Sequence, residues 1–89
     1  MIVQFTGVRL EGGFHHQHIT RLRAVSDGLV YDDSRAAWVK FIEDGNSGYV
    51  RDAYGNTAWV GVRTNGITKW LQTHADGIWT DNLLALPGY

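Results

Sequence analysis

The sequence predicts an α+β fold: an antiparallel meander of about five strands, with one short helix packed on one face and a C-terminal clasp segment. Three observations lead to this prediction. The chain of 89 residues contains eleven glycines, four Trp, four Tyr and three Phe, a composition that favours strands and turns over helices. Turn sequences recur between short β-branched segments. Only one stretch shows apolar residues at helical spacing.

The N-terminal half contains two extended segments separated by a glycine-rich loop. Residues 2–10 and 18–25 are rich in β-branched residues, and Gly12 and Gly13 break the pattern between them. Ser26-Asp27-Gly28 is a strong turn sequence. The apolar residues 29–31 are short, and we expect them to lead into the helix.

The helix is predicted over residues 35–43. Asp33 or Ser34 can cap its first turn, and Gly45 follows its end. Its apolar stripe consists of Trp38, Phe41 and Ile42. A helix of about ten residues is marginal alone, so this stripe must pack on the sheet.

Three further strands are predicted over residues 48–53, 57–63 and 67–73. The Asn65-Gly66 pair is a strong hairpin sequence between the last two. Because side chains alternate along a strand, the two faces of the middle strand are expected to differ. Ala58, Val60 and Val62 share the face toward the helix, whereas Trp59 and Arg63 share the other.

The C-terminal stretch joins a polar turn to an apolar tail. Leu83, Leu84 and Leu86 must dock on the core, because each would lose about 1.5–3 kcal/mol if left in water. The turn contains Asp76, Asp81 and Asn82. These side chains could bind calcium or magnesium, but no EF-hand spacing is present. The structural interpretation, in which they hydrogen-bond to nearby backbone, is favoured.

Bulk composition limits the classes of function. The chain is expected to be a single small domain, residues 1–89. A net charge of −1 argues against binding extended nucleic acid. The sequence has no cysteine, no signal peptide and no apolar run long enough to span a membrane, which predicts a cytoplasmic protein with no membrane partner. A small core without disulfides raises the expectation of a homo-oligomer.

No catalytic motif is apparent. His74 follows Thr73, but adjacency in sequence does not make a nucleophile–base pair. His15, His16 and His18 lie in a glycine-bounded loop and could bind a metal, although no recognisable ligand spacing completes the set. We therefore predict no enzyme activity, no metal site and no cofactor.

Aromatic residues combined with arginines give the main functional signal. An exposed Trp beside an Arg can stack a base and bind a phosphate, and the same pair is a common protein–protein hot spot. A core of this size does not need all of Trp59, Trp70, Trp79 and Tyr49. The candidate binding residues are Trp59, Trp79, Trp70, Arg51, Arg63, Asp76, Asp81 and Asn82.

The run from Leu71 to Pro87 reads LQTHADGIWTDNLLALP. With the Ser34-Arg35 helix start and Gly45, it resembles the small bacterial and phage proteins catalogued as domain of unknown function 3892. Gln72 stands where that family more often has Arg. The resemblance implies a small soluble intracellular protein, makes a phage or mobile-element origin plausible, and implies no known activity.

These observations predict a non-enzymatic, homo-oligomeric binding module. By analogy with small phage proteins, it would sequester a nucleotide-like ligand. The alternative is an interaction or inhibitor module that blocks a host protein, and a remote alternative is a hydrolase using a metal held by His15, His18 and a carboxylate. Ligand identity, partner and subunit number are not encoded in any motif.

Overall fold

The computed structural model describes residues 1–89 and contains seven strands, one α-helix and one short 3₁₀-helix. In chain order the elements are β1 (Ile2–Leu10), η1 (His16–His18), β2 (Ile19–Ser26), β3 (Leu29–Ser34), α1 (Arg35–Glu43), β4 (Ser47–Arg51), β5 (Thr57–Thr64), β6 (Lys69–Ala75) and β7 (Ile78–Thr80).

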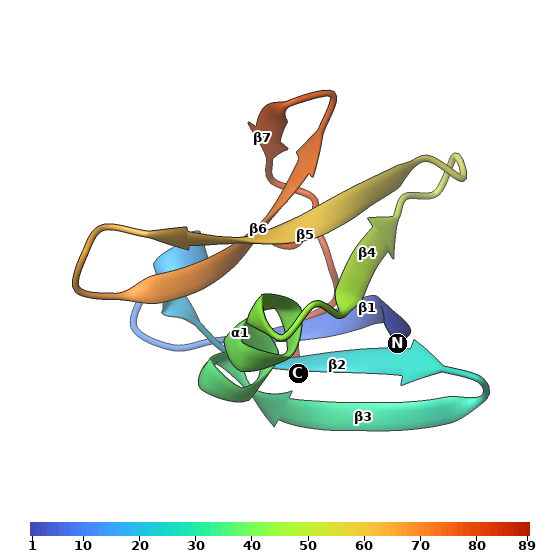
Figure 1. Ribbon diagram of the computed structural model, residues 1–89, viewed down its shortest axis with the longest axis horizontal. Helices are drawn as coiled ribbons and strands as arrows, with labels where there is room; N and C mark the ends of the chain where they lie inside the picture. The colour runs from blue at the N-terminus through green and yellow to red at the C-terminus, as the bar shows by residue number, and fades with distance from the viewer.

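The strands form one mixed sheet in the order β3-β2-β1-β4-β5-β6-β7 (Figure 1). β1 and β4 are parallel, and every other neighbouring pair is antiparallel. The fold is mostly β with one short helix, but the predicted antiparallel meander of about five strands is only roughly right. After β3 the chain crosses one face of the sheet as α1, so it enters β4 in the same direction as β1.

The two additional strands arise from tight hairpins. β2 joins β3 through Asp27 and Gly28, with φ of 50° and 79°. β6 joins β7 through Asp76 and Gly77, with φ of 53° and 78°. Positive φ at both central residues is the type I′ geometry, which matches the twist of paired strands. Each turn therefore extends the sheet by one strand.

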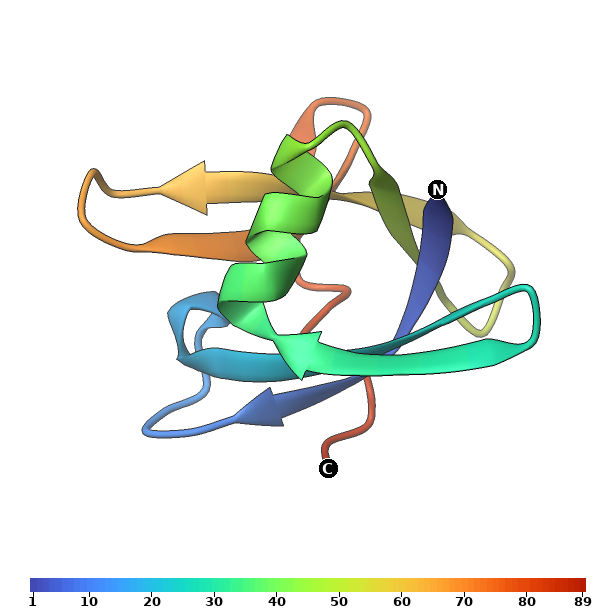
Figure 2. The ribbon, with the colours of Figure 1, turned by 60° about the horizontal axis from the view of Figure 1, so that its bottom comes forward.

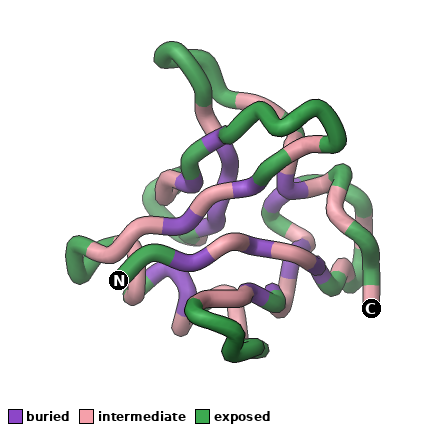
Figure 3. The backbone as a smooth tube through the Cα atoms, turned by 90° about the vertical axis from the view of Figure 1, so that its right-hand side faces the viewer, coloured by how far each residue is buried: buried purple, intermediate pink, exposed green.

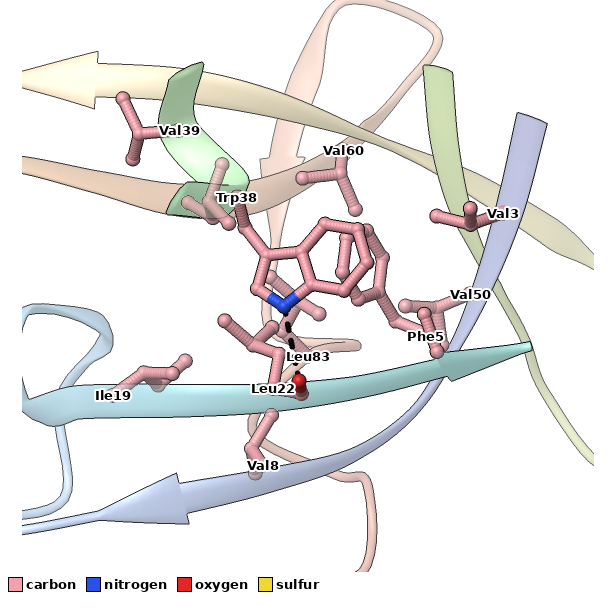
Figure 4. Packing of buried hydrophobic residues seen from close by; sticks show 12 residues of the cluster. Val3, Phe5, Val8, Ile19, Leu22, Trp38, Val39, Val50, Val60 and Leu83 are labelled. Carbon is pink, nitrogen blue, oxygen red and sulfur yellow. Dashed lines mark hydrogen bonds between the residues drawn. The ribbon is translucent and has the colours of Figure 1, made fainter. Parts of the chain in front are cut away.

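Helix α1 begins where the sequence predicts, because the Ser34 hydroxyl accepts a hydrogen bond from the Ala37 amide at 3.2 Å. It lies across one face of the sheet (Figure 2). Trp38 is its main anchor: the residue is 5% exposed, and its indole N–H donates to the Leu22 carbonyl at 2.9 Å (Figure 4). Phe5 packs edge-on against it, with ring centroids 5.0 Å apart.

The C-terminal segment (residues 81–89) completes the core. Leu83 is fully buried, and Leu84 and Leu86 pack against the same hydrophobic cluster. The Val8 amide donates to the Pro87 carbonyl at 3.0 Å, and the Tyr89 amide donates to the Val8 carbonyl at 3.2 Å. The first half of β1 therefore pairs with β4, and its second half is held by the end of the chain.

Buried residues concentrate where β1, β2, β5 and β6 meet the helix and the C-terminal segment, and the hairpin ends are exposed (Figure 3). No helix of this fold is long and apolar enough to cross a membrane.

Candidate functional site

Four aromatic side chains form a row across β4, β5, β6 and β7. Tyr49 lies opposite Trp59, and Trp59 lies opposite His74. His74 in turn lies opposite Trp79. Because the neighbours of Trp59 along β5 are buried in the core, the row lies on the outer face of the sheet. We call these four residues the aromatic row.

The rings of the row contact in two pairs, each with an edge-to-face arrangement. Ring centroids are 5.6 Å apart for Tyr49 and Trp59, and 5.3 Å apart for His74 and Trp79. Trp59 is 44% exposed and Trp79 is 40% exposed. Two large indole surfaces are therefore fixed by their neighbours and still open to solvent.

An arginine lies at each end of the row. The Arg63 guanidinium is 4.8 Å from the centre of the Trp79 ring, and the Arg51 guanidinium is 5.4 Å from that of Tyr49. Arg63 also donates to the Gln72 side-chain oxygen at 3.1 Å, and Gln72 donates to the Thr80 carbonyl at 3.2 Å. These bonds fix Arg63 between β6 and β7, so the row carries positive charge at both ends.

Gly61 makes the close approach of Trp79 to the sheet feasible. A Cβ atom at this position would lie 3.0 Å from Cη2 of Trp79 and 3.2 Å from Cδ2 of His74. A side chain there would push both rings away from the strand. The absence of a side chain at Gly61 thus shapes the row.

A groove adjoins the Tyr49 end of the row. It has a volume of about 490 Å³ and lies between the end of β4 and the C-terminal segment, with Arg51, Asp81 and Asn82 in its lining. Its volume falls within the range of about 300–1,000 Å³ typical of small-molecule sites. Arg51 belongs to both features and joins the groove to the row.

Asp52 shapes the rim of the groove. Its carboxylate accepts hydrogen bonds from the Tyr54 amide at 2.8 Å and from the amide and side chain of Asn56 at 2.9 and 3.0 Å. These bonds, led by the Asn56 side chain, lower the pKa of Asp52 below its usual value. The ionised carboxylate is occupied within the turn, beside Arg51, which is the one charged residue of β4.

Asp81 faces a buried histidine. The Nε2 atom of His16 lies 3.9 Å from Oδ1 of Asp81 and has no hydrogen-bond partner. The His16 side chain is only 9% exposed, whereas that of Asp81 is 83% exposed. Burial lowers the pKa of His16 most strongly, Asp81 raises it, and Arg63 and His15 lower it further. Burial therefore favours the neutral form of the imidazole, although it lies beside the Asp81 carboxylate.

The structure places the predicted binding residues in different environments. Trp59, Trp79, Arg51 and Arg63 come together along the row, and Arg51 meets Asp81 and Asn82 in the groove.

Two members lie elsewhere. Trp70 is only 7% exposed, so its ring cannot stack with a ligand, and Asp76 lies exposed in the β6–β7 turn.

The favoured interpretation of Asp81 and Asn82 was wrong in one respect. Their backbone carbonyls, rather than their side chains, hold the turn, since both accept from the Ala85 amide at 3.3 Å. The side chains are thereby free to line the groove.

The histidine loop is divided. His15 and His18 have ring centroids 5.8 Å apart, and Nδ1 of His18 accepts from the His15 amide at 3.2 Å. His16 is buried away from them toward Asp81. No group of three or more His, Cys, Asp or Glu side chains converges on one point.

His74 belongs to the site but was not predicted there, and Tyr49 was predicted only as one of the aromatic residues that the core does not need. Their membership depends on which residues are opposite one another across four strands. The sequence shows only that Tyr49 and Trp59 each fall in a strand, and no local signal fixes how those strands align.

Residues 4–87 match the family described as "Protein of unknown function (DUF3892)". The chain belongs to this family. No curated protein and no solved structure matches the chain.

Proposed function

We propose that the protein is a non-enzymatic binding module that takes a small nucleotide-like ligand on the aromatic row. One observation carries the proposal: Trp59 and Trp79, 44% and 40% exposed, lie in a fixed row with an arginine at each end. Exposed aromatic surface of this kind is typical of binding sites. The indole rings can stack on a planar ligand, and the two arginines can pair with an anion.

The chemistry of the row matches a planar ring that carries an anion. Stacking of a base on an aromatic side chain contributes about 1–3 kcal/mol. Arg51 lies where a phosphate could reach it from a ring stacked on Trp59 or Tyr49. The adjoining groove, with the polar side chains of Asp81 and Asn82, would receive the remainder of the ligand.

The net charge of the chain and the small number of residues in the site limit the size of the ligand. The net charge of the chain is −1, and long nucleic acids require many phosphate contacts. Two arginines and four rings suit one small nucleotide. In the biological setting that we propose, a phage-type cytoplasmic protein sequesters such a molecule, and self-association into a homo-oligomer supplements a small core.

The second candidate function is blocking of a host protein through the same surface. Trp, Tyr and Arg are the residues most enriched in interface hot spots. Beside the row, the short edge strand β7 exposes Ile78 by 68% and could be covered by a partner. The ligand proposal ranks first because the groove supplies a concave site beside the exposed rings.

Thermal unfolding with a panel of mononucleotides and dinucleotides tests the proposal. At a ligand concentration of about 100 times Kd, binding stabilises the folded state by roughly 2.7 kcal/mol, which raises Tm by about 10–20 °C for a domain of this size. Native mass spectrometry of protein purified gently from its host should show a bound mass of nucleotide size. Trp59→Ala should abolish both effects.

Phe14→Ala is the matched control, because Phe14 is 84% exposed and lies before η1, outside the row. It should leave binding intact. Three results together would favour blocking over sequestration. The purified multimer carries no small molecule, no nucleotide raises its Tm, and it captures a host protein only when Trp59 is present.

A further inference from the structure

Three arginines gather on the outer face of the other half of the sheet. Arg9 of β1 lies directly opposite Arg21 of β2, and Arg23 follows two positions later on β2. Val8 and Leu22, which alternate with them along the strands, are almost fully buried. The arginines therefore project from the face opposite the core, on strands that carry none of the aromatic row.

Like charges directly opposite each other destabilise a sheet, so this arrangement needs compensation. One carboxylate supplies part of it. Asp32 of β3 accepts from Nε of Arg21 at 3.1 Å and from Nε of Arg23 at 3.3 Å. Arg9 forms no salt bridge and is exposed. Three guanidinium groups against the one carboxylate that pairs with them leave the arginine cluster with an excess of positive charge.

The C-terminal residue fixes part of the cluster. The Tyr89 hydroxyl donates to Asp32 at 2.9 Å, and the Arg23 guanidinium stacks 3.9 Å from the centre of the Tyr89 ring. Gly7 allows the Tyr89 ring to lie this close to β1, because a Cβ atom added at this position would be only 3.2 Å from the ring. Stacking and hydrogen bonding hold Arg23 in one orientation before any ligand binds, which lowers the entropic cost of binding.

Asp32 keeps its charge. Desolvation raises its pKa, but hydrogen bonds from Tyr89, Arg23 and Arg21 together with the charge of Arg21 lower the pKa below its ordinary value. The carboxylate uses the Nε atoms of both arginines, and the Arg23 side chain remains 48% exposed. Terminal guanidinium nitrogens of Arg23 and the whole guanidinium of Arg9 therefore remain available.

We propose that Arg9, Arg21 and Arg23 form a binding site for a phosphate group of a small molecule, separate from the aromatic row. Guanidinium groups bind phosphate oxygens through paired, charge-assisted hydrogen bonds. A phosphate dianion suits this excess of positive charge and relieves the repulsion between Arg9 and Arg21. The chain as a whole has a net charge of −1, which favours a single small anion over a long polyanion.

The experiment follows the arginine Nε–Hε signals of the full chain by NMR during titration with inorganic phosphate. Total ionic strength is held constant with sodium chloride, at about pH 8, where phosphate is a dianion. Saturable shifts are expected for Arg9, Arg21 and Arg23. Arg35, whose Nη1 donates to the Gln17 carbonyl at 2.6 Å, should not shift.

Two variants with the same change of charge separate a site from general attraction. Arg9→Gln should weaken phosphate binding about tenfold. Lys40→Gln, on the exposed face of α1, should leave the affinity unchanged. Equal weakening by both variants, uniform shifts of all arginine signals, or no saturation would overturn the proposed phosphate site.

The same spectra keep this proposal distinct from the nucleotide site. Inorganic phosphate should shift the arginine signals of β1 and β2 and leave the indole signals of Trp59 and Trp79 in place. Nucleotide binding at the aromatic row should persist in Arg9→Gln. Shifts of the indole signals alone would contradict the phosphate site and leave the proposed function standing.

Discussion

Removal of the Leu83 side chain should strongly destabilise the protein, although Leu83 lies in a segment without regular secondary structure. The side chain is fully buried within the core cluster (Figure 4). The segment that carries it follows β7 in the chain and hydrogen-bonds to Val8 of β1. Leu→Ala substitutions at such sites cost about 2.7–5 kcal/mol, the lost transfer free energy plus the cavity. A domain of 89 residues has a total stability of roughly 4–13 kcal/mol, so the expected loss is a large fraction of it.

Urea unfolding followed by far-UV circular dichroism measures this loss. Leu83→Ala should lower the transition midpoint with little change in the slope m, and it should lower Tm by more than about 10 °C. Leu29→Ala is the matched control, because Leu29 is 60% exposed at the start of β3 and should change stability by less than about 0.5 kcal/mol. Equal effects of the two substitutions would refute the packing role of the C-terminal segment.

Two further predictions concern His16 and Gly61. The pKa of His16 lies below its usual 6.5, mainly because of burial, so the unfolded chain binds this proton more readily than the folded chain does. The free energy of unfolding should therefore show no loss due to His16 above pH 6.5, and it should fall as the pH drops below that value. Asp81→Asn removes the one charge that raises this pKa, so NMR titration should give a lower pKa for His16, and an unchanged pKa would contradict the pairing. Gly61→Val should displace the Trp79 ring at a cost of about 1–3 kcal/mol, seen as a shift of its indole signal while that of Trp38 stays in place.

The helix and the alternation of one strand were predictable from local sequence. The helix spans Arg35–Glu43 as expected, because a Ser cap, an apolar stripe and a following glycine specify both of its ends within a few residues. In β5, Ala58 and Val60 are buried and Trp59 is exposed, as period-2 alternation predicts.

The pairing of strands was not predictable, because it depends on contacts between distant residues. A two-residue loop at Asn65-Gly66 would pair Trp59 with Gln72. In the structure the Asn65 side chain accepts from the amides of Ile67 and Thr68 at 2.9 and 2.8 Å, which extends the loop and pairs Trp59 with His74. The pairing of Trp59 with His74, one of the three pairs in the row, therefore depends on a side-chain conformation in this turn.

The parallel pairing of β1 with β4 was also not predictable from local sequence. No local signal states that the chain returns across the sheet as α1 before β4 begins. The buried Trp70 shows the same limit. Its strand pattern is equally compatible with exposure, and only the packing of β6 against η1 and the rest of the fold determines that it is buried.

Nucleotide binding at the aromatic row can be tested by following the indole N–H signals of the four tryptophans by NMR during a nucleotide titration. We expect saturable shifts for Trp59 and Trp79, which line the exposed row, and none for Trp38 and Trp70, which are 5% and 7% exposed. Arg51→Gln should weaken the binding. Nucleotide binding that leaves Trp59 and Trp79 unshifted, or no binding of any nucleotide at millimolar concentration, would contradict binding at the row.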